Sequence, residues 1–232
     1  MDISPLKKIN RRVRMFGLVP FGDTLRKVWT ILRSKPYTLV EYPRLSKAYD
    51  LLLESERFEE LEGAIVECGC WNGGFARLMH DVSNISGEER HVWLFDSFDG
   101  GPPAEAVDMK ATGKLGKSEP NGASAALCKK AFEGVAPERV HIVEGLFQDT
   151  FPATLPRVGK IAYLHLDADF YASTKYCLEH LYDALVPGGI IIFDDYSYYL
   201  GCKKAVDEFL AHKGVLTGLV KTVQHSAYFR KP

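Results

Sequence analysis

Short apolar runs recur along the chain, and most are followed by glycine or acidic residues. Runs of this length with such boundaries predict buried strands. They lie at 64–68, 91–95, 140–143, 161–166 and 190–193, with a last run at 227–229 that predicts an edge strand.

Between these runs, apolar residues recur at intervals of three and four, which predicts helices. One predicted helix follows the glycine-containing turn at 69–74 and ends at about Val82, and two more cover 174–186 and 203–210. The triplet Pro187-Gly188-Gly189 predicts the end of the helix at 174–186. Strands that alternate with helices predict an α/β fold with a mostly parallel, doubly wound sheet. The run at 190–193 is apolar throughout, as expected when helices cover both faces of the sheet.

The first 36 residues differ from the rest and predict a basic, helical N-terminal arm before a domain at 37–232. One helix face is apolar over residues 3–16, and Gly17, Pro20 and Gly22 then interrupt the pattern. Residues 1–35 carry nine basic and two acidic side chains, a charge of +7, which leaves −8 on the remainder. The arm therefore packs on the domain or a sister subunit, or makes a weak contact with an anionic membrane surface or substrate.

Composition narrows the class of protein. The 232 residues are 46% apolar and carry a net charge of −1, which suits one globular domain and gives no overall signature of nucleic-acid binding. The chain has no 18-residue apolar run and begins without the features of a signal peptide. Its five cysteines lack a repeated C-x-x-C spacing, so we expect reduced core thiols and a cytoplasmic protein.

Two predicted strands end in residues suited to a nucleotide. The first leads from Glu67 into a turn that contains Gly69 and Gly73, and the second ends at Asp96. Ligands of open α/β sheets bind beyond the carboxyl ends of the strands, where an acidic residue receives ribose hydroxyls. The glycines alone are a weak signal, because any structural turn can carry them. Together with Asp96 they predict a cofactor that contains adenosine.

Four carboxylates follow the next two strands of the sheet: Asp167 and Asp169 follow one, and Asp194 and Asp195 the other. Adjacent strands would bring them together, and unpaired carboxylates would repel each other. A divalent cation resolves this, and oxygen ligands favour Mg²⁺, with Mn²⁺ and Ca²⁺ as alternatives. The competing interpretation is a solvated acidic rim, or ion pairs with Lys175, Lys203 and Lys204. His165, inside the strand pattern, is interpreted as a satisfied core residue.

With these motifs the chain resembles the macrocin O-methyltransferase (TylF-type) family over roughly residues 37–230. The matching segments are Tyr37-Thr38, Arg44-Leu45, the stretch from Val66 to Gly74, the stretch from Leu94 to Gly100, Gly145, the stretch from Asp149 to Pro152, the stretch from Leu166 to Lys175, Asp194-Asp195-Tyr196, Gly201 and the stretch from Lys204 to Glu208.

The resemblance implies a seven-stranded class I methyltransferase fold, usually dimeric, and methyl transfer from S-adenosylmethionine to a hydroxyl of a sugar or glycoside. It implies that Asp167, Asp194 and Asp195 hold magnesium and that Asp169 is the general base. Cofactor contacts would come from the following residues: Glu67, Gly69, Gly73, Asp96, Ser97 and Phe147.

Some residues depart from the family pattern. Asn72 replaces an arginine of the usual turn, Phe75 replaces a small residue, and Gly101-Pro102-Pro103 stands within an unusual loop. These differences affect the acceptor and details of cofactor contact. Two alternatives remain open: an O-methyltransferase for catechol-type phenols, and a non-catalytic nucleotide- or sugar-binding module.

Overall fold

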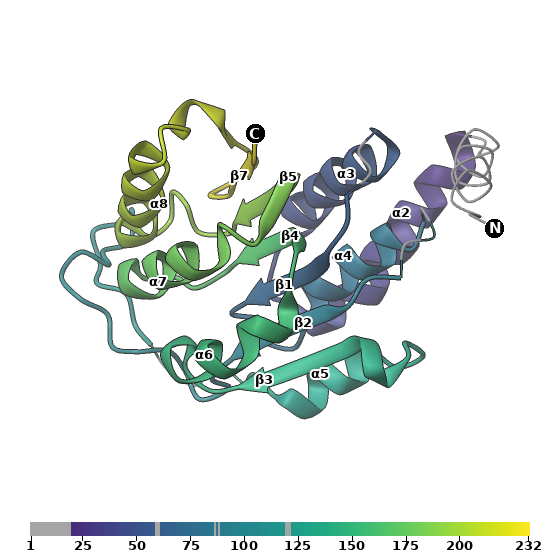
Figure 1. Cartoon of the computed structure of the whole chain (residues 1–232), viewed down its shortest axis with the longest axis horizontal. Coiled ribbons are helices and arrows are strands. Elements are labelled where there is room, and N and C mark those ends of the chain that lie inside the picture. The colour runs from purple at the N-terminus through teal and green to yellow at the C-terminus, as the bar shows by residue number, and fades with distance from the viewer. Residues whose placement is uncertain (1–19, 59–60, 86, 88, 119–121) are drawn as a thin grey trace.

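A seven-stranded sheet forms the centre of the molecule in a computed structural model, which describes residues 20–58, 61–85, 87, 89–118 and 122–232 (Figure 1). The apolar pattern at 3–16 lies outside the described residues. The strands are β1 (Ala64–Cys68), β2 (Val92–Asp96), β3 (Val140–Glu144), β4 (Ile161–Leu166), β5 (Leu185–Phe193), β6 (Leu219–Lys221) and β7 (Ala227–Arg230).

The strand order is β3-β2-β1-β4-β5-β7-β6. β1 to β5 are parallel, whereas β7 runs antiparallel to both of its neighbours. The chain builds outward from β1 in one direction and from β4 in the other, so the order reverses between these two strands. In such sheets the carboxyl ends of the strands at the reversal form the ligand-binding crevice.

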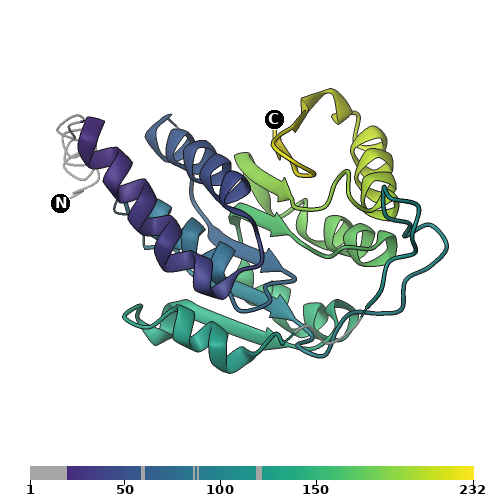
Figure 2. The same cartoon turned by 180° about the vertical axis from the view of Figure 1, so that it is seen from behind.

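Helices cover both faces of the sheet, because successive strand residues point to opposite sides. Ile65 packs in the core beneath α2 to α5, and its neighbour Val66 in the core beneath α6 to α8. Figures 1 and 2 show these two helical layers from opposite sides. The helices are α2 (Pro20–Ser34), α3 (Tyr42–Phe58), α4 (Gly74–Ser83), α5 (Ala125–Ala131), α6 (Phe147–Val158), α7 (Tyr171–Leu181) and α8 (Leu200–His212), with short 3-10 helices at Lys35–Tyr37, Pro137–Arg139 and Leu216–Gly218.

The structure confirms the doubly wound α/β fold and the five parallel strands, but it corrects one boundary and the position of one strand in the sheet. The predicted helix 174–186 ends at Leu181, and the Pro-Gly-Gly triplet lies inside β5. Gly188 N–H donates to Lys231 O and Lys231 N–H donates to Gly189 O, so pairing with the chain end keeps this segment extended. The strand at 227–229 is also no edge strand, because β6 pairs with its outer side.

Residues 20–34 of the predicted N-terminal arm form α2. The prediction that Gly22 interrupts the helical pattern is wrong, because α2 begins at Pro20 and continues through Gly22. Proline is well tolerated in the first turn of a helix, which lacks internal partners for its N–H groups. α2 lies against α3 and α4 (Figure 2).

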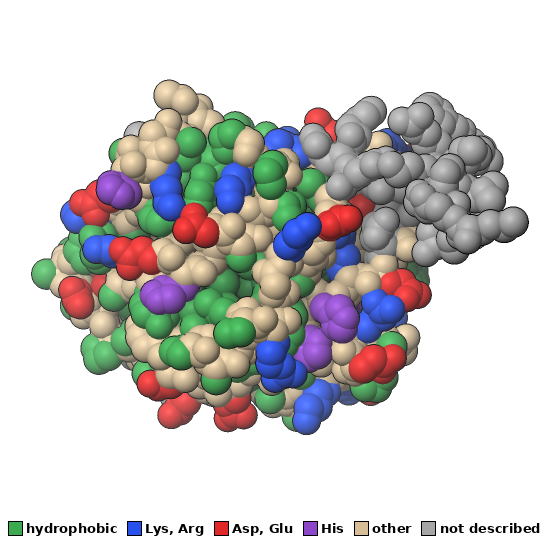
Figure 3. Space-filling model, in the orientation of Figure 1, with side chains coloured by type: hydrophobic (Ala, Val, Ile, Leu, Met, Phe, Trp, Pro, Cys, Tyr) green, Lys and Arg blue, Asp and Glu red, His purple; other side chains and the backbone are tan. Residues whose placement is uncertain are grey.

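The cysteines lie in the interior of the molecule, and charged side chains lie on its surface. All five cysteines are buried and free, as predicted. Figure 3 shows basic and acidic side chains interspersed over the described part of one face. Among the described residues, no helix combines the length and the apolar composition needed to cross a bilayer.

Candidate active site

A cavity of about 300 Å³ opens at the carboxyl ends of β1, β2, β4 and β5. Its walls come from the turn after β1, the segment after β2, the start of α6 and the acidic loops after β4 and β5. Thr38, Leu39, Val40 and Arg44 close it from the side of α3. The cavity therefore lies at the reversal of strand order, where the fold predicts a ligand.

Most of the residues predicted to contact a cofactor line this cavity, namely Glu67, Gly69, Asp96, Ser97 and Phe147. Gly73 does not line it. That residue takes a left-handed conformation with φ of 80° immediately before α4, and its missing side chain would face Cys128, Leu94 and Phe132.

Asp96 anchors the turn after β1. Its Oδ2 accepts a hydrogen bond from Trp71 N–H and its Oδ1 from Phe98 N–H, both at 2.8 Å. Burial raises the pKa of this carboxyl group, and the backbone N–H donors partly oppose the rise. Ser97 Oγ–H donates to Gly100 O, which shapes the loop beyond β2. Asp96 thus connects the two loops on the side of the cavity where the cofactor is predicted to bind.

Gly69 is required by the backbone around it. Its φ is 80°, and a Cβ atom there would lie 1.9 Å from the carbonyl oxygen of Asp167. Only glycine therefore allows β1 and β4 to converge this closely at their carboxyl ends. This approach brings the glycine turn beside the first predicted metal ligand.

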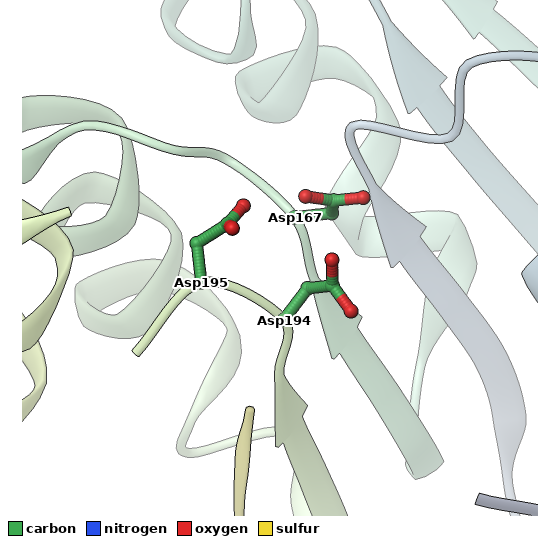
Figure 4. A group of neighbouring side chains, drawn as sticks. All are labelled: Asp167, Asp194 and Asp195. Carbon is green, nitrogen blue, oxygen red and sulfur yellow. The ribbon is translucent and has the colours of Figure 1, made fainter. Parts of the chain in front are cut away.

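Asp167, Asp194 and Asp195 form one carboxylate cluster at the floor of the cavity. An oxygen from each lies within 4.8 Å of the others, and Figure 4 shows the three side chains gathered at the strand ends. Burial raises the pKa of Asp167, and the neighbouring carboxylates raise it further. Burial and then Asp194 raise the pKa of Asp195, while hydrogen bonds with Asp169 and Asp167 partly oppose that rise. The fold thus confines like charges that would separate in an unfolded chain.

The three lysines considered as partners of this cluster pair elsewhere. Lys175 lies near Glu179, Lys203 near Asp207 and Lys204 near Glu208, each within its own helix. Among the ion pairs of the described residues, none joins one of these three lysines to the acidic cluster.

An arginine that the sequence reasoning had not assigned reaches the cluster instead. Arg44 Nη1 donates to Asp194 Oδ2 at 2.5 Å. Asp194 Oδ1 is buried and has no hydrogen-bond partner among the described residues. One arginine therefore leaves part of the cluster uncompensated, and a set of carboxylate oxygens with one unpartnered buried atom fits a hard divalent cation. The only earlier signal for Arg44 was its place in the Arg44-Leu45 segment of the family pattern.

Asp169 also lines the cavity but stands outside the group of three carboxylates. Its φ is 54°, a left-handed conformation that is uncommon for residues other than glycine. Burial raises the pKa of its carboxyl group, Asp195 and Asp194 raise it further, and Lys110 opposes the rise. A carboxyl group with this environment is suited to accept a proton nearer neutral pH than a free aspartate.

His165 is fully buried, as predicted for a core residue, but only one of its ring nitrogens is satisfied. Nδ1 lies 2.8 Å from Glu67 Oε1, whereas Nε2 lacks a hydrogen-bond partner in the described part of the chain. Burial lowers its pKa, but Asp194 and Glu67 outweigh this and raise it to about 9.

This fold and this site define a class I methyltransferase: a seven-stranded sheet of this order carries a cavity at the strand reversal. The sequence profile of the family described as macrocin-O-methyltransferase (TylF) matches residues 9–231, so the chain belongs to that family and is an O-methyltransferase. The resemblance found in the sequence is thereby confirmed.

Two relatives and one solved structure illustrate the similarity. The chain is 32% identical over 188 residues to the 8-demethyl-8-(2,3-dimethoxy-alpha-L-rhamnosyl)-tetracenomycin-C 4'-O-methyltransferase of Streptomyces olivaceus, covering 78% of this chain and 70% of the relative. It is 30% identical over 205 residues to the mycinamicin III 3''-O-methyltransferase of Micromonospora griseorubida, covering 84% and 78%. The structure of the O-methyltransferase NovP superposes with a TM-score of 0.71 at 28% identity, covering 84% of this chain and 82% of NovP.

Proposed function

We propose that this enzyme transfers a methyl group from S-adenosylmethionine to a hydroxyl group of a sugar or glycoside, with a divalent cation held by Asp167, Asp194 and Asp195. The observation that carries the proposal is the meeting of these three carboxylates beside the cofactor cavity. The two named relatives support the acceptor class, because one name contains a rhamnosyl compound and the other names position 3'' of mycinamicin III.

The cofactor would occupy the side of the cavity formed by β1 and β2. Asp96 would receive its ribose hydroxyls, and Phe147 and Ser97 also line the cavity. S-adenosylmethionine supplies a methyl group on a cationic sulfonium. The carboxylates around the cavity favour a cation in their neighbourhood, so the site does not repel this donor.

Mg²⁺ is the cation we propose, with Mn²⁺ and Ca²⁺ as substitutes, because the donors are all oxygen atoms. When bound, such an ion polarises a hydroxyl oxygen and favours its deprotonation. Asp194 would take part through Oδ1, which Arg44 leaves unpaired. The arginine meanwhile orients the same carboxylate through Oδ2.

Asp169 is the proposed general base. Its raised pKa matches proton transfer from an activated hydroxyl better than that of an exposed aspartate would. Asp169 would accept the proton of the acceptor hydroxyl, while S-adenosylmethionine would supply the methyl group and leave as S-adenosylhomocysteine. In-line geometry would give inversion at the methyl group, and alignment of this kind contributes about 7–11 kcal/mol in favourable systems.

Methyl transfer to a panel of sugars, glycosides and catechols, with and without EDTA, tests the proposal. We expect transfer to a sugar hydroxyl, its loss with EDTA and its return with Mg²⁺. Full activity in EDTA would contradict the role of the cation, and transfer to catechols alone would contradict the acceptor class. Since the chain belongs to an enzyme family, the non-catalytic module is no longer favoured. The homodimer, the cytoplasmic location and a membrane contact of the arm stay predictions.

A further inference from the structure

A buried polar chain joins the start of α4 to the carboxylate cluster. Ala76 N–H, in the first turn of α4, donates to Glu67 Oε2 at 3.0 Å. The other carboxylate oxygen of Glu67 lies 2.8 Å from His165 Nδ1. His165 Nε2 then faces Asp194 Oδ1 across 3.7 Å. The chain crosses β1, β4 and β5, which are neighbours in the sheet.

The strand register produces this alignment. Glu67 on β1 is paired with His165 on β4, and His165 is paired with Ile192 on β5, two residues before Asp194. Neither Glu67 nor His165 is exposed by more than 2%. Phe75 stacks on the imidazole with the ring centroids 3.7 Å apart and the planes at 8°, so the ring has little freedom to rotate.

The two facing atoms at the end of this chain are both unsatisfied. Among the described residues, His165 Nε2 and Asp194 Oδ1 have no hydrogen-bond partner. Buried polar atoms are nearly always satisfied in native proteins, and each exception calls for an explanation. Here the ring nitrogen points at the one oxygen of Asp194 that Arg44 leaves open.

We propose that His165, held by Glu67, is a positioning residue that fixes Asp194 Oδ1 for cation binding. The inference rests on the proposed function, since it concerns the same carboxylate cluster. Arg44 then holds one oxygen of Asp194 while His165 restrains the other, so the carboxylate cannot turn away from Asp167 and Asp195. This arrangement also gives Glu67 a structural role, because both of its carboxylate oxygens have hydrogen-bond partners within the protein. Residues that orient metal ligands in this way typically change metal affinity by 10- to 100-fold when they are replaced.

Two substitutions of His165 separate positioning from packing. The amide of asparagine reaches about as far as Nδ1, so His165→Asn retains the contact with Glu67 and loses the one directed at Asp194. The amide of glutamine reaches about as far as Nε2, so His165→Gln retains a donor directed at Asp194. His212→Asn, at the exposed end of α8, is the matched control.

The readout is binding of Mn²⁺ alone to each full-length variant, measured by electron paramagnetic resonance. We expect His165→Asn to weaken Mn²⁺ binding by about 10- to 100-fold, His165→Gln to restore most of the affinity, and His212→Asn to match the wild type. Binding of S-adenosylhomocysteine, measured by calorimetry, should persist in all three and shows that the variants are folded.

Wild-type affinity in His165→Asn, or an equal loss in both His165 variants, would overturn the positioning role. If the wild-type protein binds no Mn²⁺, the proposed cation site itself is wrong and the inference is overturned with it. If the wild type binds Mn²⁺ and Asp167→Asn abolishes binding while His165→Asn does not, the cation site stands and only the role of His165 is refuted.

Discussion

Arg44 Nη1 donates a hydrogen bond of 2.5 Å to Asp194 Oδ2, although 150 positions separate the two residues in the sequence. Both side chains are largely buried, at 17% and 6% exposed. The contact joins α3 to the end of β5 and pairs an arginine with one carboxylate of the cluster.

Replacement of Arg44 should destabilise the cation-free protein. Loss of one partner from a buried ion pair leaves a charge without compensation, which typically costs about 3–5 kcal/mol. We expect Arg44→Met to lower the free energy of unfolding by about 3 kcal/mol in EDTA, and by less in Mg²⁺, because the ion would replace part of the missing positive charge. Urea denaturation in both buffers measures the difference. Lys47→Met, exposed on the same helix, is the control, and equal stability of the two variants in EDTA would refute this prediction.

Removal of the proposed base should affect catalysis and spare binding. General bases typically contribute about 10²–10⁴-fold to rate. We expect Asp169→Asn to lower kcat by about this factor, while its affinity for S-adenosylhomocysteine changes little. Steady-state kinetics with the acceptor found in the panel, together with calorimetry, check both parts. Asp149→Asn, which alters an exposed carboxylate on α6, should stay active, and an active Asp169→Asn would exclude that residue as the base.

Gly201 leaves room for a buried aspartate. A Cβ atom at this position would lie 1.9 Å from Asp108 Oδ1, an atom that accepts a hydrogen bond from Tyr171 N–H at 2.7 Å at the start of α7. We expect Gly201→Ala to lower the free energy of unfolding by about 1–3 kcal/mol, the usual cost of overpacking. Gly22→Ala in α2 meets no atom within 4 Å and should be neutral or slightly stabilising. Chemical denaturation compares the two, and equal midpoints would show that Asp108 moves aside freely.

His141 should make stability depend on pH at the opposite end of the sheet. Burial lowers its pKa, and the neighbouring His91 and Arg157 lower it further. A lowered pKa in the folded state means that its contribution is present above the unfolded value of about 6.5 and is lost as the pH falls through the folded pKa.

The denaturation midpoint should therefore fall less between about pH 7.5 and pH 5.5 in His141→Gln than in the wild type. The ring of His141 stacks 4.0 Å from that of Trp93, so tryptophan fluorescence should also follow this titration and lose that component in the variant. An identical pH dependence in the two proteins would show that His141 does not contribute.

The fold was largely predictable because its strands are local patterns. Runs such as 64–68 and 161–166 are mostly apolar, with one polar residue each, which identifies buried parallel strands without knowledge of their neighbours. β6 was missed because it has three residues and is mostly exposed. α6 was missed because Pro152 and Pro156 lie inside it and obscure the helical pattern.

The order of the elements along the chain also predicted much of the site. Since parallel strands end at the same edge of a sheet, the residues that follow β1, β2, β4 and β5 had to approach each other, and Asp167, Asp194 and Asp195 do so. The order of the strands along the chain and the ends of the apolar runs are therefore enough to place these acidic residues at the strand ends.

Tertiary structure alone decided which side chains complete the cluster. Arg44 comes from a helix that precedes the sheet in the sequence, and no local period predicts which carboxylate it meets. The facing of His165 and Asp194 depends on the register between β4 and β5, and a shift of one residue would turn His165 to the other face of the sheet. The sequence by itself therefore determined the fold class and the acidic cluster, whereas the packing of distant elements determined how that cluster is held, because register and helix docking are set by contacts across the whole core.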